Sequence, residues 1–171
     1  LSAGHETVAD LAEADVILVN TCGFIESAKT EAIENILEAC AYKQQNPNLK
    51  VIVTGCLAER YRSQIEEEIP EVDAVVGCAS NKAIDTIVAR LFHGEDHLES
   101  YGAKKDFPLG GKRVIGTPAH YAYLKIAEGC NNRCHYCAIP GIRGPLHSRD
   151  LADCVAEARW LAGEGVKELI V

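Results

Sequence analysis

The first half of the chain alternates short apolar runs with amphipathic stretches. The apolar runs, each typical of a buried strand, occupy residues 16–19, 50–54 and 73–76. Between and after them, apolar positions three or four residues apart predict helices over residues 26–45, 58–68 and 82–92. Strands that alternate with helices in this way indicate an α/β fold built on a parallel sheet.

The second half repeats this alternation after an irregular stretch. Residues 93–118 are rich in glycine and proline and predict a linker or an irregular extension. The pattern then predicts a strand, a helix and a strand over residues 121–127, 150–163 and 166–171, a βαβ unit that would open a barrel or a doubly wound sheet. We therefore expect an α/β domain over 1–95, a linker over 96–118 and the start of a second domain over 119–171.

Three cysteines in the second half form the most informative motif. Cys130, Cys134 and Cys137 have the spacing C-x3-C-x2-C, with Tyr136 directly before the third thiol. Four thiolates close a 4Fe-4S cluster, whereas three leave one iron open to bind and activate a ligand. A fourth thiol at ferredoxin spacing is absent, since the next cysteine is Cys154. This spacing resembles the signature of radical S-adenosylmethionine (radical SAM) enzymes.

Two other uses of these cysteines stay open at this point. A structural zinc site needs four nitrogen or sulfur ligands, and His135 or His147 is available as the fourth. Disulfides are the weaker alternative, because 171 residues is long for a domain stapled by disulfides. Eight cysteines in a chain of this length favour metal ligation, in a reducing cytoplasm, over disulfides.

Three further cysteines each follow a predicted strand of the first half. They are Cys22, Cys56 and Cys78. The carboxyl ends of parallel strands lie at one edge of a sheet, where ligands bind, so distant cysteines can meet there. We expect a second metal site that includes Cys22 and Cys56. The alternative is that they are buried free cysteines, which is at least as good an interpretation for Cys78.

Charge and hydropathy narrow the possible partners. The net charge is −8, which is unfavourable for general nucleic-acid binding because backbone affinity comes from Lys and Arg. No apolar run approaches the length of a membrane span. Residues 129–149 contain three arginines and no Asp or Glu, which suits an anionic cluster.

Both halves of the sequence resemble the radical SAM methylthiotransferase family. The first half does so in Asn20-Thr-Cys-Gly-Phe24 and in Gly55-Cys-Leu-Ala-Glu-Arg60. The second half does so in the run from Thr117 to Cys130 and in Cys137-Ala-Ile-Pro-Gly-Ile-Arg-Gly144. Within the family, the residues around Cys22 and Cys56 are similar to the branch that modifies an aspartate of small-subunit ribosomal protein twelve.

The resemblance implies cofactors and roles. Two 4Fe-4S clusters are expected, with Cys130, Cys134 and Cys137 holding the one that binds SAM, and Tyr136 packing near the adenine. Cys22 and Cys56 would hold two corners of an auxiliary cluster that delivers sulfur. A radical derived from SAM would remove hydrogen from the aspartate β-carbon, where a methylthio group would replace it. The implied partners are ribosomal protein twelve and an electron donor such as flavodoxin or ferredoxin. No individual residue is assigned as catalytic.

The sequence also departs from the family pattern. His147 stands where an arginine is usual, and Cys78 stands where the family does not place a ligand. We expect the third auxiliary ligand upstream of Leu1 and the rest of the barrel beyond Val171, so that the chain is an inactive piece of a longer enzyme. Two alternatives remain: a tRNA adenosine methylthiotransferase of the same family, and a non-catalytic metal-binding module.

Overall fold

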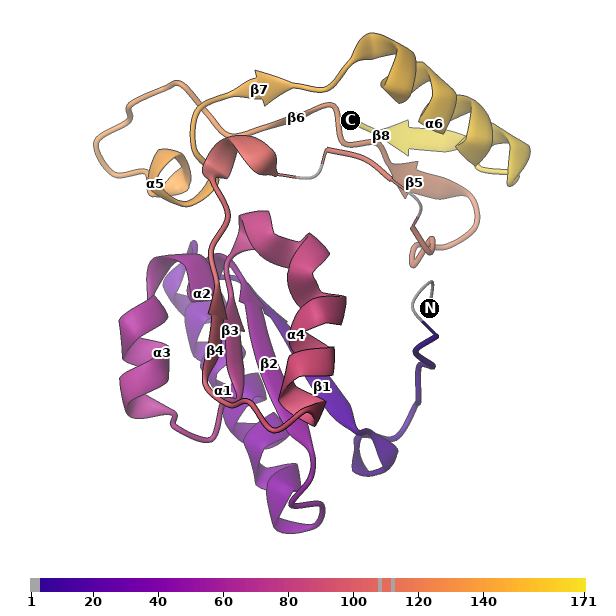
Figure 1. Cartoon of the computed structure of the whole chain (residues 1–171). Coiled ribbons are helices and arrows are strands. Elements are labelled where there is room, and N and C mark those ends of the chain that lie inside the picture. Colours follow the sequence, from indigo (N-terminus) through magenta and orange to yellow (C-terminus); the bar gives the residue numbers. More distant parts are fainter. Residues whose placement is uncertain (1–3, 108, 112) are drawn as a thin grey trace. The chain divides into compact units, whose positions relative to one another are not determined.

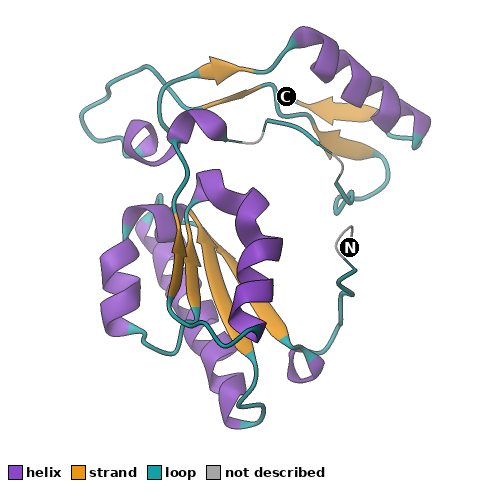
Figure 2. Ribbon diagram, viewed as in Figure 1, coloured by secondary structure: helices purple, strands orange, loops and turns teal. Residues whose placement is uncertain are grey.

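The computed structural model describes residues 4–107, 109–111 and 113–171. It divides into two compact units, Leu1–Ala103 and Lys104–Val171, which are described separately (Figures 1 and 2). Both units combine helices with strands, so the predicted α/β class is confirmed. Among the described helices, none is both long enough and apolar enough to cross a lipid bilayer.

Unit 1 is built on a four-stranded parallel sheet in the order β1-β2-β3-β4. The strands are β1 (Val16–Thr21), β2 (Lys50–Gly55), β3 (Ala74–Val76) and β4 (Leu98–Ser100). Because the strands are parallel, all four carboxyl ends lie along one edge of the sheet.

Helices cover both faces of this sheet. They are α1 (Glu26–Ala41), α2 (Cys56–Arg60), α3 (Arg62–Glu68) and α4 (Ile84–Phe92). Alternate residues of β2 face opposite ways: Val51 and Val53 pack with α1, α2 and α3, whereas Ile52 packs with α4. Figure 1 shows α4 on one side of the sheet and the other three helices behind it. The continuous apolar run of β2 follows from this burial on both faces.

The structure corrects three details of the predicted elements. The stretch expected to be a linker contains β4, which pairs with β3 and completes the sheet. The helix expected over 58–68 begins at Cys56 and is broken at Tyr61 (φ −123°, ψ 34°) into α2 and α3. The third helix begins at Ile84, after a 3-10 helix over Cys78–Ala83. Pro108 and Lys112 of the expected linker lie outside the described residues.

Unit 2 holds the predicted βαβ unit. Its elements are β5 (Tyr121–Tyr123), β6 (Ala127–Glu128), α5 (Ile139–Arg143), β7 (His147–Ser148), α6 (Leu151–Gly163) and β8 (Glu168–Ile170). Strands β5 and β8 pair in parallel, with α6 between them in sequence, and Ala122, Leu161 and Val166 form their shared core. Strands β6 and β7 form a separate antiparallel pair.

A buried carboxylate fixes the amino end of the sheet in unit 1. Asp73 accepts hydrogen bonds from the backbone N–H of Val51 (2.7 Å) and from the Nζ atoms of Lys43 (2.6 Å) and Lys50 (3.3 Å). Its carbonyl also accepts the N–H of Leu98. Asp73 therefore connects β2, β3 and β4. The positive charges of Lys43 and Lys50 together offset the cost of burying its carboxylate.

We expect Asp73→Ala to lower the local free energy of unfolding of the sheet by about 3 kcal/mol, because it leaves a buried amide and two lysines without their acceptor. Amide hydrogen exchange of β2 and β3 measures this directly. The control Glu38→Ala removes an exposed acid and should change the value by less than about 0.5 kcal/mol. A loss for Asp73→Ala as small as that of the control contradicts the role given to Asp73.

Candidate functional site

Cys22 and Cys56 lie at the ends of neighbouring parallel strands. The register of β1 and β2 ends with Thr21 opposite Gly55. Cys22 directly follows β1, and Cys56 directly follows β2 as the first residue of α2. Gly55 has φ +99°, and a Cβ there would fall 2.2 Å from the carbonyl oxygen of Thr21. Only glycine permits this backbone approach, which brings the two cysteine-bearing loops side by side.

A side chain from α2 ties these loops together. The Nη1 atom of Arg60 donates to the carbonyl of Gly23, the residue after Cys22, at 3.1 Å. The thiol of Cys22 is exposed and that of Cys56 is half-buried. Both cysteines are thus held on a fixed backbone at the carboxyl edge of the sheet.

Cys78 follows the next strand along the same edge but has different surroundings. It is buried, and its backbone N–H donates to Oε2 of Glu59 in α2 (3.1 Å). Glu59 therefore fixes the loop after β3 to the helix that begins with Cys56. The sequence pattern did not single out Glu59, whose position in the Cys-Leu-Ala-Glu run gave no hint of a contact with β3.

Cys130, Cys134 and Cys137 share one loop of unit 2, between β6 and β7. The antiparallel pairs Ala127–Ser148 and Glu128–His147 close its base. Above them, the N–H of Cys130 donates to the carbonyl of Gly144 (3.1 Å). Gly129 has φ +78°, and a Cβ there would fall 2.2 Å from the carbonyl oxygen of Pro145. The loop is therefore pinched at its base by backbone contact.

Within the loop, the thiols have different exposures. Cys134 is exposed, whereas Cys130 and Cys137 are half-buried. The N–H of Cys137 donates to the carbonyl of Cys134 (3.0 Å), which forms a turn between the last two cysteines. Tyr136 is 90% exposed, so no residue in the described part of the chain covers it.

The structure does not close either cysteine set into a metal site. Among the described residues, no three or more His, Cys, Asp and Glu side chains converge as metal ligands. This holds for the three-cysteine loop and for its neighbours His135 and His147 alike. All eight cysteines are described, and none of them forms a disulfide.

Glu128 anchors the base of the loop. Its side chain is only 10% exposed, and it pairs with Lys125 and with Nη1 of Arg143 (3.2 Å). It also accepts the N–H of Gly129 at 3.1 Å. Burial alone would raise the pKa of Glu128, but the hydrogen bonds from Lys125 and Gly129 and the charge of Arg143 outweigh it and lower that pKa. Sequence reasoning missed this residue, although it directly precedes the acid-free stretch.

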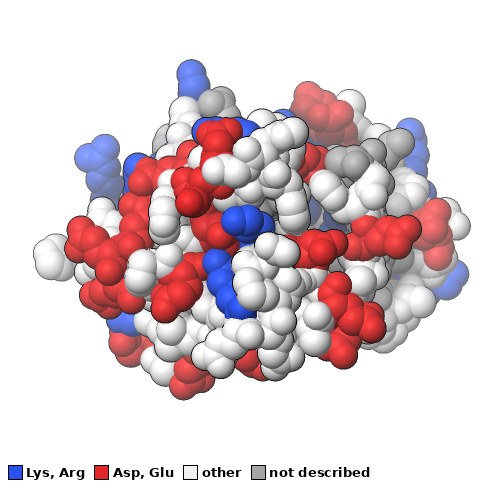
Figure 3. All heavy atoms as spheres, turned by 60° about the horizontal axis from the view of Figure 1, so that its bottom comes forward, with Lys and Arg blue, Asp and Glu red and all other residues white. Residues whose placement is uncertain are grey.

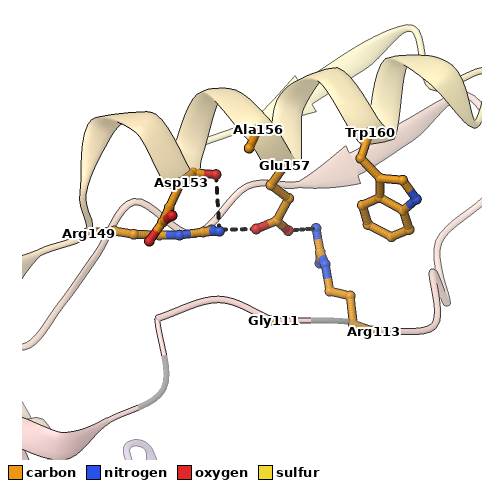
Figure 4. Close-up of a pocket in the computed structure, with 7 residues that line it drawn as sticks. All are labelled: Gly111, Arg113, Arg149, Asp153, Ala156, Glu157 and Trp160. Atoms are coloured by element: carbon orange, nitrogen blue, oxygen red, sulfur yellow. Dashed lines mark hydrogen bonds and ion pairs between the residues drawn. The ribbon is translucent and has the colours of Figure 1, made fainter.

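Arg149 joins the other end of the loop to α6. Its guanidinium donates to Glu157 of α6, and both side chains are less than a tenth exposed. Arg113 binds the second oxygen of Glu157 at 2.9 Å, so the carboxylate lies between two cations (Figure 4). A cavity of about 550 Å³ opens beside this bridge, lined by Trp160 among others, and no cysteine contributes to it. The Arg149–Glu157–Arg113 bridge therefore supports the loop without contacting the thiols.

Two family models match the chain. Residues 1–77 match the Uncharacterized protein family UPF0004, and residues 124–171 match the Radical SAM superfamily. The first match includes Cys22 and Cys56, and the second includes the loop of Cys130, Cys134 and Cys137.

Relatives match both segments at once. Three proteins named ribosomal protein uS12 methylthiotransferase RimO are 46%, 49% and 48% identical to the chain over 99%, 97% and 98% of its length. They come from Caldicellulosiruptor saccharolyticus, Acetivibrio thermocellus and Clostridioides difficile. The chain belongs to the radical SAM methylthiotransferase family. It spans 39%, 38% and 38% of the length of these three relatives.

The predicted resemblance to the radical SAM methylthiotransferases is thus confirmed. The two matched segments lie in different units, and each contains a set of cysteines: the strand ends of unit 1 and the β6–β7 loop of unit 2. The assignment of individual ligands remains a prediction.

We expect Glu128→Gln to loosen the loop, because the amide keeps the shape of the side chain but loses its charge-assisted bonds to Lys125 and Arg143. The expected result is about tenfold faster amide hydrogen exchange over residues 129–146 in the metal-free protein. The control Glu164→Gln changes an exposed acid just after α6 and should leave exchange in the loop unaltered. Equal protection of the loop in Glu128→Gln and in the parent protein contradicts the anchoring role.

Proposed function

We propose that the chain is part of a radical SAM methylthiotransferase that adds a methylthio group to the β-carbon of an aspartate in ribosomal protein uS12. One observation carries this proposal: two separate sets of cysteines, one on a single loop of unit 2 and one at the strand ends of unit 1. A three-cysteine loop alone fits many reactions. A second set in its own α/β unit fits an enzyme that also has to deliver sulfur.

The residues present fit iron-sulfur ligation. Thiolates are the preferred ligands of such clusters, and none of the described cysteines is consumed by a disulfide. The loop of Cys130, Cys134 and Cys137 is hydrogen-bonded at its base, and none of its three cysteines is buried in the core, so a shared ligand can reach them. The absence of Asp and Glu from residues 129–149 removes carboxylates that would repel an anionic cluster.

In this proposal, Cys130, Cys134 and Cys137 hold the SAM-binding 4Fe-4S cluster. Such a cluster, when bound, supplies one-electron reduction of SAM. Glu128 and Arg143 keep the loop closed at its base, and Tyr136 offers an open ring face for the adenine of SAM. These residues bind and orient, and none is assigned a proton transfer.

Cys22 and Cys56 hold part of an auxiliary 4Fe-4S cluster in the proposed enzyme. The close approach of their two loops supports a shared ligand. The burial of Cys78 and its hydrogen bond to Glu59 support a structural role for that residue instead. An electron donor such as flavodoxin or ferredoxin, in the cytoplasm, completes the reaction.

A protein substrate suits the charge of the chain better than tRNA does. Unit 1 carries 18 acidic and 7 basic side chains, an unfavourable balance for contacts to phosphates. The relatives are named for uS12, a protein. Together these observations favour the ribosomal substrate over the tRNA adenosine alternative.

Anaerobic reconstitution of the full-length protein with iron and sulfide tests the proposal. We expect Cys130→Ala to lose about half of the bound iron and the SAM-dependent change in the EPR spectrum, because one of two clusters loses a ligand. Cys22→Ala should also lose iron but keep the response to SAM. Cys154→Ala, which changes a buried cysteine of α6, is the matched control and should retain both.

Mass spectrometry of ribosomal peptides and of tRNA nucleosides from a deletion strain identifies the substrate. Loss of the methylthio group from uS12, restored by the parent gene and not by Cys130→Ala, is the expected result. Loss of methylthioadenosine from tRNA with uS12 still modified overturns the substrate. An unchanged EPR spectrum in Cys130→Ala overturns the cluster assignment.

A further inference from the structure

An apolar groove runs along the outer side of unit 1, between α1 and α3. It encloses about 360 Å³, and no cysteine is among its lining residues, although Leu57 of its floor directly follows Cys56. Ile33 and Leu37 of α1 form one wall, and the other wall includes Tyr61 and Gln64. Leu57, Ile65 and Ile69 form its floor and belong to the buried core.

The α1 wall of this groove contains two exposed aliphatic side chains. Ile33 is 37% exposed and Leu37 is 51% exposed, and they are neighbours at i and i+4 on the helix. With Lys29 one turn earlier, they form a stripe of roughly 12 Å along α1. That length matches two turns of a partner helix whose apolar residues recur every three or four positions.

Acidic side chains border the groove without cationic partners. Glu68 of α3 lines the groove itself, whereas Glu34 of α1 and Glu67 of α3 are the sequence neighbours of the lining residues Ile33 and Glu68. All three are exposed, and within the described part of the chain none of them forms an ion pair. The nearby cation, Lys29, is already bonded to Glu26 (2.8 Å) and lies 5.5 Å from the Tyr61 ring centre.

The net negative charge of unit 1 also favours a cationic partner. Unit 1 has 18 acidic and 7 basic side chains, whereas unit 2 has 7 acidic and 10 basic ones. On the face of the chain shown in Figure 3, acidic side chains take up more of the surface than basic ones. A negative field of this kind attracts cationic partners and repels anionic ones, including an acidic electron donor or a nucleic acid.

We propose that the groove between α1 and α3 binds a basic amphipathic helix of a partner protein. Apolar residues of that helix fill the space above Leu57 and Ile65, between Ile33 and Leu37 on one side and Tyr61 on the other. Its Lys and Arg side chains pair with Glu34, Glu67 and Glu68. This docking site uses no cysteine, so the test of the docking proposal does not depend on the proposed chemistry.

The test uses the full-length protein and a synthetic helical peptide of about 18 residues. The peptide carries leucine at i, i+3, i+4 and i+7 and lysine at its other positions. A matched peptide with glutamate in place of every lysine is the first control. We expect the lysine peptide to bind with a Kd that rises with salt and the glutamate peptide to show no binding, as measured by fluorescence anisotropy.

Variants of exposed residues locate the site without threatening the fold. Leu37→Gln removes part of the apolar wall and should raise the Kd about tenfold. Glu34→Lys reverses a charge at the border and should raise it roughly fivefold. The controls are Phe92→Gln, an exposed apolar residue of α4 on the opposite side of the sheet, and Glu31→Lys on the side of α1 away from the groove. Both should bind like the parent.

Three outcomes overturn the proposal. Equal binding by all variants shows that the peptide is held by overall charge alone. Self-association of the parent protein that Leu37→Gln abolishes shows that a second copy occupies the groove. Binding of the lysine peptide that appears only after other parts of the full-length protein are removed shows that the protein covers the groove itself.

Discussion

The close approach of backbones at two glycines determines how the two cysteine-bearing segments of this protein are positioned. Gly55 lets β2 lie against Thr21, so the two cysteines that follow these strands are neighbours. Gly129 lets the chain cross Pro145, so the loop with three cysteines is pinched shut. In both places, a side chain larger than hydrogen would separate the segments that carry the thiols. The other contacts at each site, such as those of Arg60 and Glu128, stabilise the backbone arrangement that these glycines permit.

Local patterns in the sequence predicted the fold class and the cysteine-bearing loops. The alternation of apolar runs and amphipathic stretches was enough for the parallel sheet, because the strands of unit 1 are buried on both faces. It missed β4, whose three residues Leu98–Ser100 have no apolar run and form a strand only because β3 offers a free edge. It also missed the break at Tyr61, since Leu57 and Ile65 keep a helical spacing across it.

The supporting residues of the site could not be predicted from the sequence. Glu128, Arg149 and Glu59 act through partners 15, 8 and 19 residues away, and such contacts depend on how the elements pack. The motif of Cys130, Cys134 and Cys137 can be recognised in the sequence because its three cysteines lie close together along the chain. The meeting of Cys22 and Cys56 was inferable only through the rule that parallel strands end at one edge.

The difference between local and distant cysteines has a consequence for biosynthesis. The three cysteines of the unit 2 loop lie within eight residues, so they can capture metal while the chain around them is still unfolded. Cys22 and Cys56 are separated by a helix and a strand, and they meet only after β1 and β2 have paired. In the proposed enzyme, metal loading at the sheet edge therefore follows folding of unit 1, whereas loading at the loop can begin on the nascent chain.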